Sequence, residues 1–447
     1  MRADHGIAAD GRGAQTSGHG CLIRDDCLPA MQALTGELAG RVDLVLTDPP
    51  YNTGGRFTYH DDFGSAQRWL NFIAPRLAAA RDLLADDGAM VVHIDEHQHH
   101  HLKGLLERLF GERNALGDIV WDKLNPKGDA GHVATQHETL IAFAKNRATF
   151  KANRHLRRVK PHAARLLAKA AELVACVGSE RVPDDLRSVV ERYSLGVSLE
   201  RHRRVYSLDD ARTDYWRWLQ AQGFGAGVRA YRHLDDDGRV YRTVSMAWPN
   251  KRRPGADYFV PLLHPRTGRP CPLPLRGWRN PSATMQRLLR EGQIVFGDDE
   301  TKQPERKYWL DEHAHENLPS VIQYGGSDDA RLRELGIPFD NPKPVGLTRM
   351  LVDAFTGGRG LVLDPFAGSG TVGHACLEMA AEGGDIRFIL IQNRESLATD
   401  QPHQADAAEF CRSLGLPAEI ATLTAERLRR CAARLRIDQG FIARLSL

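Results

Sequence analysis

The sequence lacks closely spaced cysteines, and it lacks any apolar run near membrane-spanning length. Its seven cysteines are scattered, and no two form a CxxC pair, which argues against a zinc or redox site of that kind and against a disulfide framework. No apolar run approaches the roughly 20 residues that cross a bilayer. Residues 1–20 hold no apolar core like that of a signal peptide, and we expect them to form a flexible tail. These absences favour a reducing, cytoplasmic setting with no membrane partner.

The sequence also lacks a strong overall charge, although its charges are unevenly spread. The formal net charge is +3 over 447 residues. Residues 151–260 contain about 22 basic and 13 acidic residues, a difference near +9, which leaves the rest of the chain near −6. A basic middle between more acidic ends favours contact with a polyanion, although a solvated arginine-rich surface would give the same count.

Short apolar strands alternate with helices near both ends of the chain, and this order predicts a parallel α/β sheet. The expected strands cover residues 22–26, 42–47, 86–95, 118–123, 137–146, 361–363 and 386–392. The expected helices cover residues 29–38, 69–84, 101–110, 345–355, 422–435 and a segment from about 371. Between about 147 and 320 the periodicity fails and loops dominate, which predicts a separate insertion.

A glycine-rich turn follows one predicted strand, in LVLDPFAGSGTVGHA. Glycines such as Gly368 and Gly370 let the backbone adopt positive φ and approach a ligand closely, and the helix that starts near Thr371 suits a polar or anionic group. The spacing is not the G-x-G-x-x-G dinucleotide fingerprint, which disfavours a nicotinamide oxidoreductase. Many turns of this kind use glycine for packing alone, so the turn by itself leaves ligand binding open.

A second motif, Asp48-Pro49-Pro50-Tyr51, follows the predicted strand Val42–Thr47. The prolines fix φ and stiffen the segment just past a strand's carboxyl end, where open α/β sheets bind ligands. The Asp48 carboxylate and the Pro49 carbonyl are two acceptors that suit a planar –NH2 group with two donors. The Tyr51 ring suits stacking on a planar heterocycle. The alternative is a Pro-Pro turn with a packed tyrosine.

Together the two motifs resemble those of the S-adenosylmethionine-dependent DNA amino-methyltransferases, in the β order with DPPY before FAGSG. DPPYNTG, SVIQYGGSDDARLRELG, GQIVFGDDETKQPERKYW, NPKPVGLTRML and DPFAGSGTVGHACLE resemble stretches of the Mod subunits of type III restriction–modification systems, over residues 21–435. This resemblance implies a Rossmann-like methyltransferase fold, in which helices flank a mostly parallel sheet. The catalytic domain would comprise residues 21–146 and 321–447, around an α+β target-recognition insertion at 147–320.

The resemblance also assigns site residues. Asp48, Pro49, Pro50 and Tyr51 would hold the target amine. The residues expected to bind S-adenosyl-L-methionine are Asp26, Lys343, Pro344, Asp364, Phe366, Gly368, Ser369, Gly370 and Gln392. Within this set, Asp26 matches an acid that contacts the cofactor adenine, and Lys343 with Pro344 matches the segment over the methionine moiety. Gln392 stands where many relatives carry an acid for the ribose hydroxyls.

The expected reaction is methylation of adenine N6 in a base flipped out of the duplex. Stacking on Tyr51 would return about 1–3 kcal/mol of the cost of flipping. Asp48 and the Pro49 carbonyl would favour a localised lone pair on the amine, and Asp48 would stabilise the positive charge that grows there. The chemistry requires no metal and no covalent enzyme intermediate. Asp48 at the first motif position favours adenine; cytosine N4 methylation and a non-catalytic DNA-binding subunit remain as alternatives.

The insertion would bind double-stranded DNA, mainly through arginine contacts to the backbone. Arg201–Tyr206, Tyr215–Trp218 and Trp248–Arg253 combine basic and aromatic residues, although a structural role suits each of them better. The resemblance implies a second copy of the chain, in a homodimer, as a further partner. It also implies a separate restriction subunit, because the sequence shows no helicase or nuclease motif that could cleave DNA. The histidine-rich His93–His101 invites a metal interpretation, but we expect a solvated helix start there and a structural role for His132–Leu140.

Overall fold

The computed structural model describes residues 18–125, 133–182, 184–196, 198–250, 255–437 and 442–444. The chain forms two compact units: unit 1 is Met1–Arg158 with Asn317–Leu447, and unit 2 is Val159–Glu316. Most of the predicted tail at 1–20 lies outside the described residues, and Gly20 already begins the first strand.

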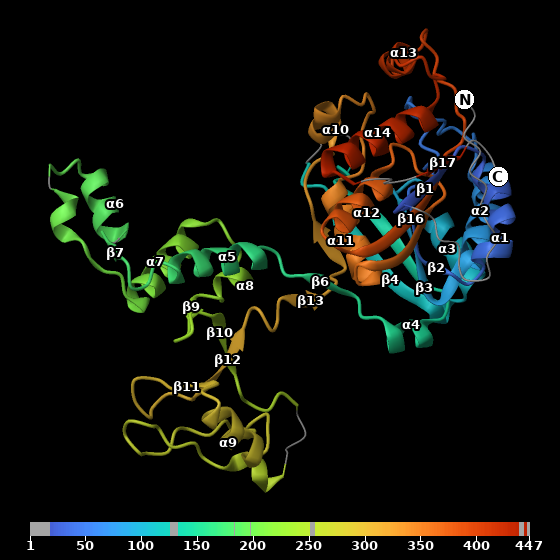
Figure 1. The fold of residues 1–447 in the computed structure, drawn as a ribbon. Helices are drawn as coiled ribbons and strands as arrows, with labels where there is room; N and C mark the ends of the chain where they lie inside the picture. Colours follow the sequence, from blue (N-terminus) through green and yellow to red (C-terminus); the bar gives the residue numbers. More distant parts are fainter. Residues whose placement is uncertain are drawn as a thin grey trace. The chain divides into compact units, whose positions relative to one another are not determined.

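Unit 1 is an α/β domain built on one nine-stranded sheet (Figure 1). Its strands are β1 (Gly20–Ile23), β2 (Val42–Thr47), β3 (Leu84–Ile94), β4 (Ala115–Asp122), β5 (His137–Ala144), β14 (Val321–Gln323), β15 (Arg359–Asp364), β16 (Asp385–Ile391) and β17 (Ile442–Arg444). Its helices are α1 (Cys27–Leu38), α2 (Ala66–Leu83), α3 (His99–Phe110), η1 (Glu112–Asn114), α4 (Arg147–Asn153), α10 (Asp329–Leu335), α11 (Val345–Thr356), α12 (Thr371–Ala381), α13 (Ala405–Ser413) and α14 (Ile420–Leu435).

The strand order is β14-β4-β5-β3-β2-β15-β16-β1-β17. Strand β5 is antiparallel to both of its neighbours, whereas the other neighbouring strands are parallel. From β2 the chain runs through α2 to β3 on one side, and from β15 it runs through α12 to β16 on the other. The boundary between β2 and β15 is therefore a topological switch point, where open α/β sheets bind ligands. The mostly parallel, helix-flanked sheet confirms the predicted fold class.

Helices cover both faces of this sheet, and the two faces form separate cores. Along β2, Leu44 and Leu46 join a cluster that includes buried residues of α11, α12 and α14, while Val45 joins a cluster with buried residues of α1, α2 and α3. Successive side chains of a strand point to opposite faces, and both faces are apolar here. This is why the predicted strands read as continuous apolar runs rather than alternating ones.

Unit 2 is an α+β region with its own four-stranded sheet, ordered β11-β12-β10-β9 and antiparallel throughout its described pairs. Its strands are β7 (Glu180–Arg181), β8 (Arg204–Val205), β9 (His233–Leu234), β10 (Val240–Ser245), β11 (Ile294–Val295) and β12 (Glu305–Trp309). Its helices are α5 (Ala163–Val174), α6 (Asp184–Arg192), η2 (Leu199–His202), α7 (Leu208–Ala221), α8 (Ala226–Arg229), η3 (Ala256–Phe259) and α9 (Ser282–Arg290). Two short strands, β6 (Arg157–Val159) and β13 (His315–Asn317), pair where the chain passes between the units.

One aromatic residue from each of two predicted basic–aromatic clusters belongs to a hydrophobic cluster of unit 2. Tyr206 and Tyr215 are buried in one hydrophobic cluster. The Tyr206 hydroxyl donates to Asp214 Oδ2 at 2.7 Å, and the Tyr215 hydroxyl donates to the Tyr231 carbonyl at 2.9 Å. These tyrosines are therefore structural, and part of the third cluster, 248–253, lies outside the described residues. Among the helices that the structure describes, none has the length and apolar character needed to cross a membrane.

Candidate active site

The two sequence motifs meet because β2 and β15 are adjacent and parallel. Leu44 pairs with Val362 and Val45 with Leu363, so both strands end at the same edge of the sheet. The Thr47 hydroxyl donates to Asp364 Oδ1 at 2.8 Å and joins the two strand ends directly. Segments more than 300 positions apart therefore share one site.

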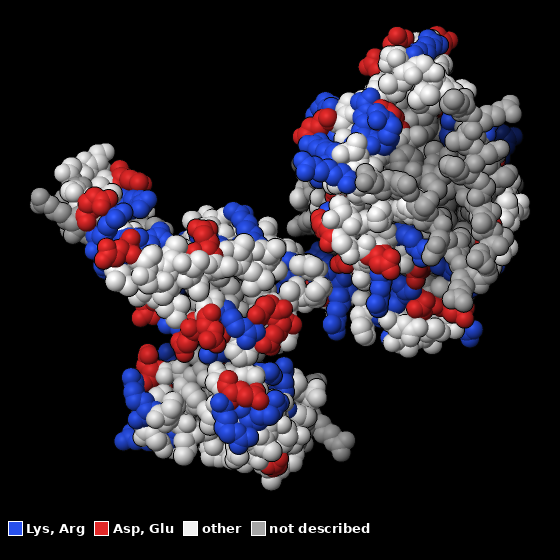
Figure 2. Space-filling view, in the orientation of Figure 1, with Lys and Arg blue, Asp and Glu red and all other residues white. Residues whose placement is uncertain are grey.

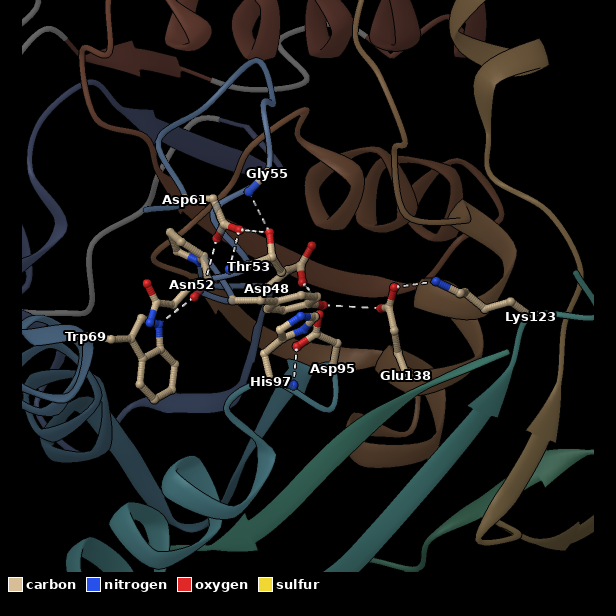
Figure 3. Close-up of polar contacts among 12 residues, drawn as sticks. Asp48, Asn52, Thr53, Gly55, Asp61, Trp69, Asp95, His97, Lys123 and Glu138 are labelled. Carbon is tan, nitrogen blue, oxygen red and sulfur yellow. Dashed lines mark hydrogen bonds and ion pairs between the residues drawn. The ribbon is translucent and has the colours of Figure 1, made fainter. Parts of the chain in front are cut away.

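The loop after Asp48 is braced by side chains from its own neighbourhood (Figure 3). Trp69 Nε1 donates to the Pro50 carbonyl at 2.7 Å. The Asp61 carboxylate accepts from the backbone N–H groups of Asn52 and Thr53, both at 2.9 Å. The loop geometry is therefore held by a tryptophan and an aspartate as well as by the prolines.

A charged cluster surrounds the Asp48 carboxylate. The Tyr51 hydroxyl donates to Asp48 Oδ1 at 2.5 Å. Lys343 Nζ lies 2.7 Å from Glu138 Oε2, 3.0 Å from the Tyr51 hydroxyl and 3.4 Å from Asp48 Oδ2. Lys123 Nζ donates to the other Glu138 oxygen at 3.0 Å, which Figure 3 shows. The Tyr51 phenol therefore lies among two carboxylates and the Lys343 ammonium group, and Lys123 holds Glu138 from its other oxygen.

These contacts shift the pKa values of the cluster. Burial would raise the pKa of Glu138, but the Lys343 and Lys123 ammonium groups overcome it and lower the pKa to about 2. Burial would lower the pKa of Lys343, but Asp48 and Glu138 hold it well above its ordinary value. Burial, followed by the charges of Asp48 and Glu138, raises the pKa of Tyr51 well above its usual range. At neutral pH Glu138 is therefore ionised, Lys343 is charged and Tyr51 keeps its proton.

The glycine turn connects β15 to α12, and hydrogen bonds tie it to Gln392, just after β16, and to Thr424 of α14. Gly368 has φ +50° and Gly370 has φ +83°, which favours glycine at both positions. The Gly368 N–H donates to Gln392 Oε1 at 2.7 Å, and its carbonyl accepts from the Thr424 hydroxyl at 2.6 Å. A Cβ built on Gly370 would lie 3.0 Å from Thr424 Cγ2. Gly370 therefore serves the turn and its packing against α14.

A buried arginine supports the same turn from α14. Arg427 is fully buried, and its Nη1 donates to the Ser369 hydroxyl at 2.6 Å, to the Ser369 carbonyl at 3.2 Å and to the Thr371 hydroxyl at 3.0 Å. Burial lowers the pKa of this guanidinium to about 10. The guanidinium group still carries its positive charge at neutral pH, so a buried cation contacts the turn at Ser369 and Thr371.

One cavity of about 780 Å³ extends between the two motifs. The predicted residues that line it are Asp26, Asp48, Pro50, Tyr51, Lys343, Asp364, Phe366, Gly368, Ser369 and Gln392. Pro49, Pro344 and Gly370 are not part of this lining. Pro49 is buried, and Pro344 caps α11. These three residues shape the elements that carry the lining residues.

Three expected cofactor residues have partners that the sequence did not show. The Lys343 ammonium group, in the segment expected over the methionine moiety, contacts the Asp48 and Glu138 carboxylates. Asp26 caps α1 through Leu28 N at 2.8 Å and pairs with Arg76 at 2.6 Å. Gln392 accepts from the glycine turn.

Glu138, Lys123 and Arg427 are site or supporting residues that sequence reasoning missed. Glu138 lies in the segment expected to be structural. It is the second residue of β5, the strand that runs antiparallel to its neighbours β3 and β4. The amino end of an antiparallel strand lies at the edge where parallel strands have their carboxyl ends. The signal available was therefore an acid just before the apolar run TLIAFA.

The histidine-rich stretch contains one group of possible metal ligands. Atoms of Asp95, Glu96 and His97 lie within 4.8 Å of one another, and His97 Nδ1 is 2.8 Å from Asp95 Oδ2. His93 is buried in β3 with its ring edge-on to Trp121, and burial lowers its pKa to about 4. His93 is therefore neutral at pH 7 and lies in the cavity wall.

Two curated proteins, both Mod subunits of type III restriction-modification enzymes, are similar to this chain over 94% of its length. The Mod subunit of the type III restriction-modification enzyme EcoP15I from Escherichia coli is 29% identical, over 94% of this chain and 64% of its own length. The StyLTI Mod subunit from Salmonella typhimurium is 23% identical, over 94% and 58%. The chain thus spans about three fifths of these relatives.

Solved structures give a weaker likeness. The PvuII DNA methyltransferase (cytosine-N4-specific) is 12% identical, with 97% of each chain covered and a TM-score of 0.39. An M1.HpyAVI–SAM complex is 13% identical, with 84% of this chain and 94% of that chain covered and a TM-score of 0.34.

Residues 42–400 match the family of N6/N4 DNA methylases. This match extends over most of the sequence and includes both motifs, so the chain belongs to that family.

Proposed function

We propose that this chain transfers a methyl group from S-adenosyl-L-methionine to the N6 amino group of adenine in DNA. The observation that carries the proposal is the shared cavity, in which a carboxylate on a stiff loop faces a glycine turn from the neighbouring strand. Family membership sets the reaction class, and the Asp48 carboxylate favours adenine. Cytosine N4 is the competing target.

The residues present fit the proposed cofactor. Seven acidic side chains line the cavity against three from lysine and arginine, so the lining favours a cation such as a sulfonium. The turn at Gly368 has no side chain to obstruct a ligand, and a Cβ built there would meet only the Phe366 carbonyl, at 3.9 Å. As the resemblance implies, Asp26 would hold the adenine, Gln392 the ribose, and the segment at Lys343 and Pro344 the methionine moiety. Phe366, Gly368 and Ser369 line the same cavity. When bound, the cofactor supplies an electrophilic methyl group.

The protein's contribution is to orient and polarise the target amine. Asp48 lines the cavity and would accept one N–H of the amine. The Pro49 carbonyl is the second acceptor that the motif offers, and it would take the other N–H once the base is bound. As the amine becomes positively charged during attack, the Asp48 carboxylate stabilises it. The half-buried Tyr51 ring provides a stacking surface for the flipped base. Positioning supplies much of the remaining rate enhancement.

We assign DNA recognition to unit 2. Figure 2 shows lysine and arginine side chains gathered around α9 on the face drawn. The exposed arginines of this part of unit 2 are Arg266, Arg269, Arg276, Arg279, Arg287 and Arg290. Such residues suit phosphate contacts, which give salt-sensitive affinity. By analogy with the type III Mod relatives, a separate restriction subunit and a second copy of this chain are proposed partners.

The function is tested by replacing Asp48 with alanine in the purified chain. We expect transfer of tritiated methyl groups to bacterial genomic DNA to fall about 100-fold or more, because the charge that stabilises the amine is lost. Cofactor binding, measured by calorimetry, should stay within about twofold because the glycine turn is unchanged. Asp82→Ala is the matched control, since Asp82 is an exposed acid paired with Arg81 on α2. Transfer retained by Asp48→Ala would refute the assigned role.

A further inference from the structure

The proposed acceptor of the target amine already has two donors. The Tyr51 hydroxyl lies 2.5 Å from Asp48 Oδ1, and Lys343 Nζ lies 3.4 Å from Asp48 Oδ2. An amino group that binds Asp48 would compete with both of them for the same carboxylate oxygens. A donor displaced from Asp48 would remain in a buried site, where a polar group without a partner is costly.

Glu138 is placed to take both donors. Its Oε2 lies 2.7 Å from Lys343 Nζ and 3.2 Å from the Tyr51 hydroxyl. The phenol has a single proton, so it donates either to Asp48 or to Glu138. Lys343 carries three protons and contacts both carboxylates. A rotation of the hydroxyl and a small shift of the ammonium group would therefore free Asp48 without leaving either donor unpaired.

Glu138 is also held ready for this role. Its side chain is 10% exposed, and its second oxygen accepts from Lys123 Nζ at 3.0 Å. Lys123 comes from the carboxyl end of β4, next to β5 in the sheet. The register pairs Trp121 with Glu138, so the backbone sets the position of the acid. Glu138 thus has one oxygen fixed and one facing the cluster.

We propose that Glu138 is a positioning residue that withdraws Lys343 and the Tyr51 hydroxyl from Asp48 when the target amine binds. This inference rests on the proposed function. No proton leaves the cluster in the exchange: the tyrosine proton changes acceptor by rotation, and Lys343 remains an ammonium ion. Without the charge of Glu138, Lys343 would pair more closely with Asp48 and compete with the amine.

The test compares Glu138→Gln and Glu138→Asp by single-turnover methyl transfer on DNA that the wild-type chain methylates. Glutamine keeps the shape and loses the charge, so we expect a rate about 10- to 100-fold lower, the effect of one charge-assisted hydrogen bond. Aspartate keeps the charge and should recover part of the rate. The cofactor dissociation constant should change less than about twofold in both variants. Asp118→Asn is the matched control, because Asp118 is a strand acid paired with Lys103 outside the cavity.

A second measurement separates positioning from support of the fold. In a Tyr51→Phe background one of the two competing donors is absent, so the loss caused by Glu138→Gln should shrink. The inference is overturned if Glu138→Gln transfers as fast as wild type, or if it loses the same factor in both backgrounds. If the wild-type chain methylates nothing, the proposed function fails; if wild type and Glu138→Gln are equally fast, only this inference fails.

Discussion

Asp48 and Asp364 end neighbouring strands, yet their surroundings differ. The Asp48 side chain is 34% exposed and faces the Lys343 ammonium group. Asp364 is buried, with its Oδ1 accepting from Thr47 and from the Phe366 N–H. Burial raises the pKa of Asp364 to about 7, and the nearby Asp48 charge adds to the effect. Asp48 is therefore suited to contact a ligand, whereas Asp364 is suited to hold the start of the glycine turn through its hydrogen bonds.

This difference predicts a pH dependence of stability. The pKa of Asp364 is about 7 in the folded chain and 3.8 in the reference state, so the folded state binds the proton more tightly. The stabilising contribution is fully present below pH 4 and is lost as pH rises to 7, by at most about 1.4 kcal/mol per pH unit. Denaturant unfolding of wild type and Asp364→Asn between pH 4 and 8, without cofactor, measures it. The difference in unfolding free energy should fall across this range; a constant difference would contradict the account.

At the residue scale, the sequence predicts which residues directly follow a strand. It does not predict which side chains from distant segments come into contact. Asp48 and Tyr51 could be predicted because a stiff motif directly follows an apolar run. The contact of Lys343 with Glu138 could not, because it depends on where two separate segments bring their side chains. A local sequence pattern cannot predict a contact between two residues that are 205 positions apart in the chain.

At the scale of elements, the glycine turn and α14 form one packed assembly. Thr424 of α14 donates to the Gly368 carbonyl of the turn, and Arg427 of α14 donates to the carbonyl and hydroxyl of Ser369. Gly373 also brings α12 close to α14, since a Cβ there would lie 2.7 Å from a Leu428 methyl carbon. The geometry of the cofactor side therefore depends on a helix that contains no recognisable motif.

Gly370→Ala tests this packing. A side chain there would combine φ +83° with a Cβ 3.0 Å from Thr424 Cγ2. The expected loss of unfolding free energy is about 1–2 kcal/mol from the backbone conformation alone. Gly36→Ala is the control, since Gly36 lies within α1 with nothing within 4 Å, and it should stabilise the chain by up to about 1 kcal/mol. Denaturant unfolding at one pH compares the two, and equal midpoints would contradict the packing described here.

Most elements of unit 1 could be predicted because their apolar runs are long and bounded by Gly, Pro or charged residues. The strand order could not, because it depends on which runs pair across long loops. Strand β5 shows the limit: its apolar run TLIAFA is evident, but its antiparallel direction is not. That direction places Glu138 at the site edge rather than at the opposite edge.

At the scale of the whole molecule, unit 2 leaves and rejoins unit 1 at one place. The Leu318 N–H donates to the Leu156 carbonyl at 3.0 Å, so the two ends of the insertion are adjacent within unit 1. Each unit has its own hydrophobic core. Unit 1 contains every residue that lines the cavity.

Excision of residues 159–316, with a short Gly-Ser linker in their place, should therefore leave a folded unit 1. We expect cofactor binding within about threefold of the full chain, because the lining is intact. Site-specific methylation should be lost, because unit 2 is the proposed DNA-recognition region. Calorimetry and methyl transfer measure the two properties. An excised chain that still methylates specific sites would show that unit 1 recognises the sequence.

The most direct test of the central claim is to map modified bases in host DNA by long-read sequencing. A host that expresses the wild-type chain should carry N6-methyladenine at one recurring sequence. A host that expresses Asp48→Ala at the same level should carry none at that sequence. N4-methylcytosine in place of N6-methyladenine, or unchanged adenine methylation with Asp48→Ala, would contradict the account.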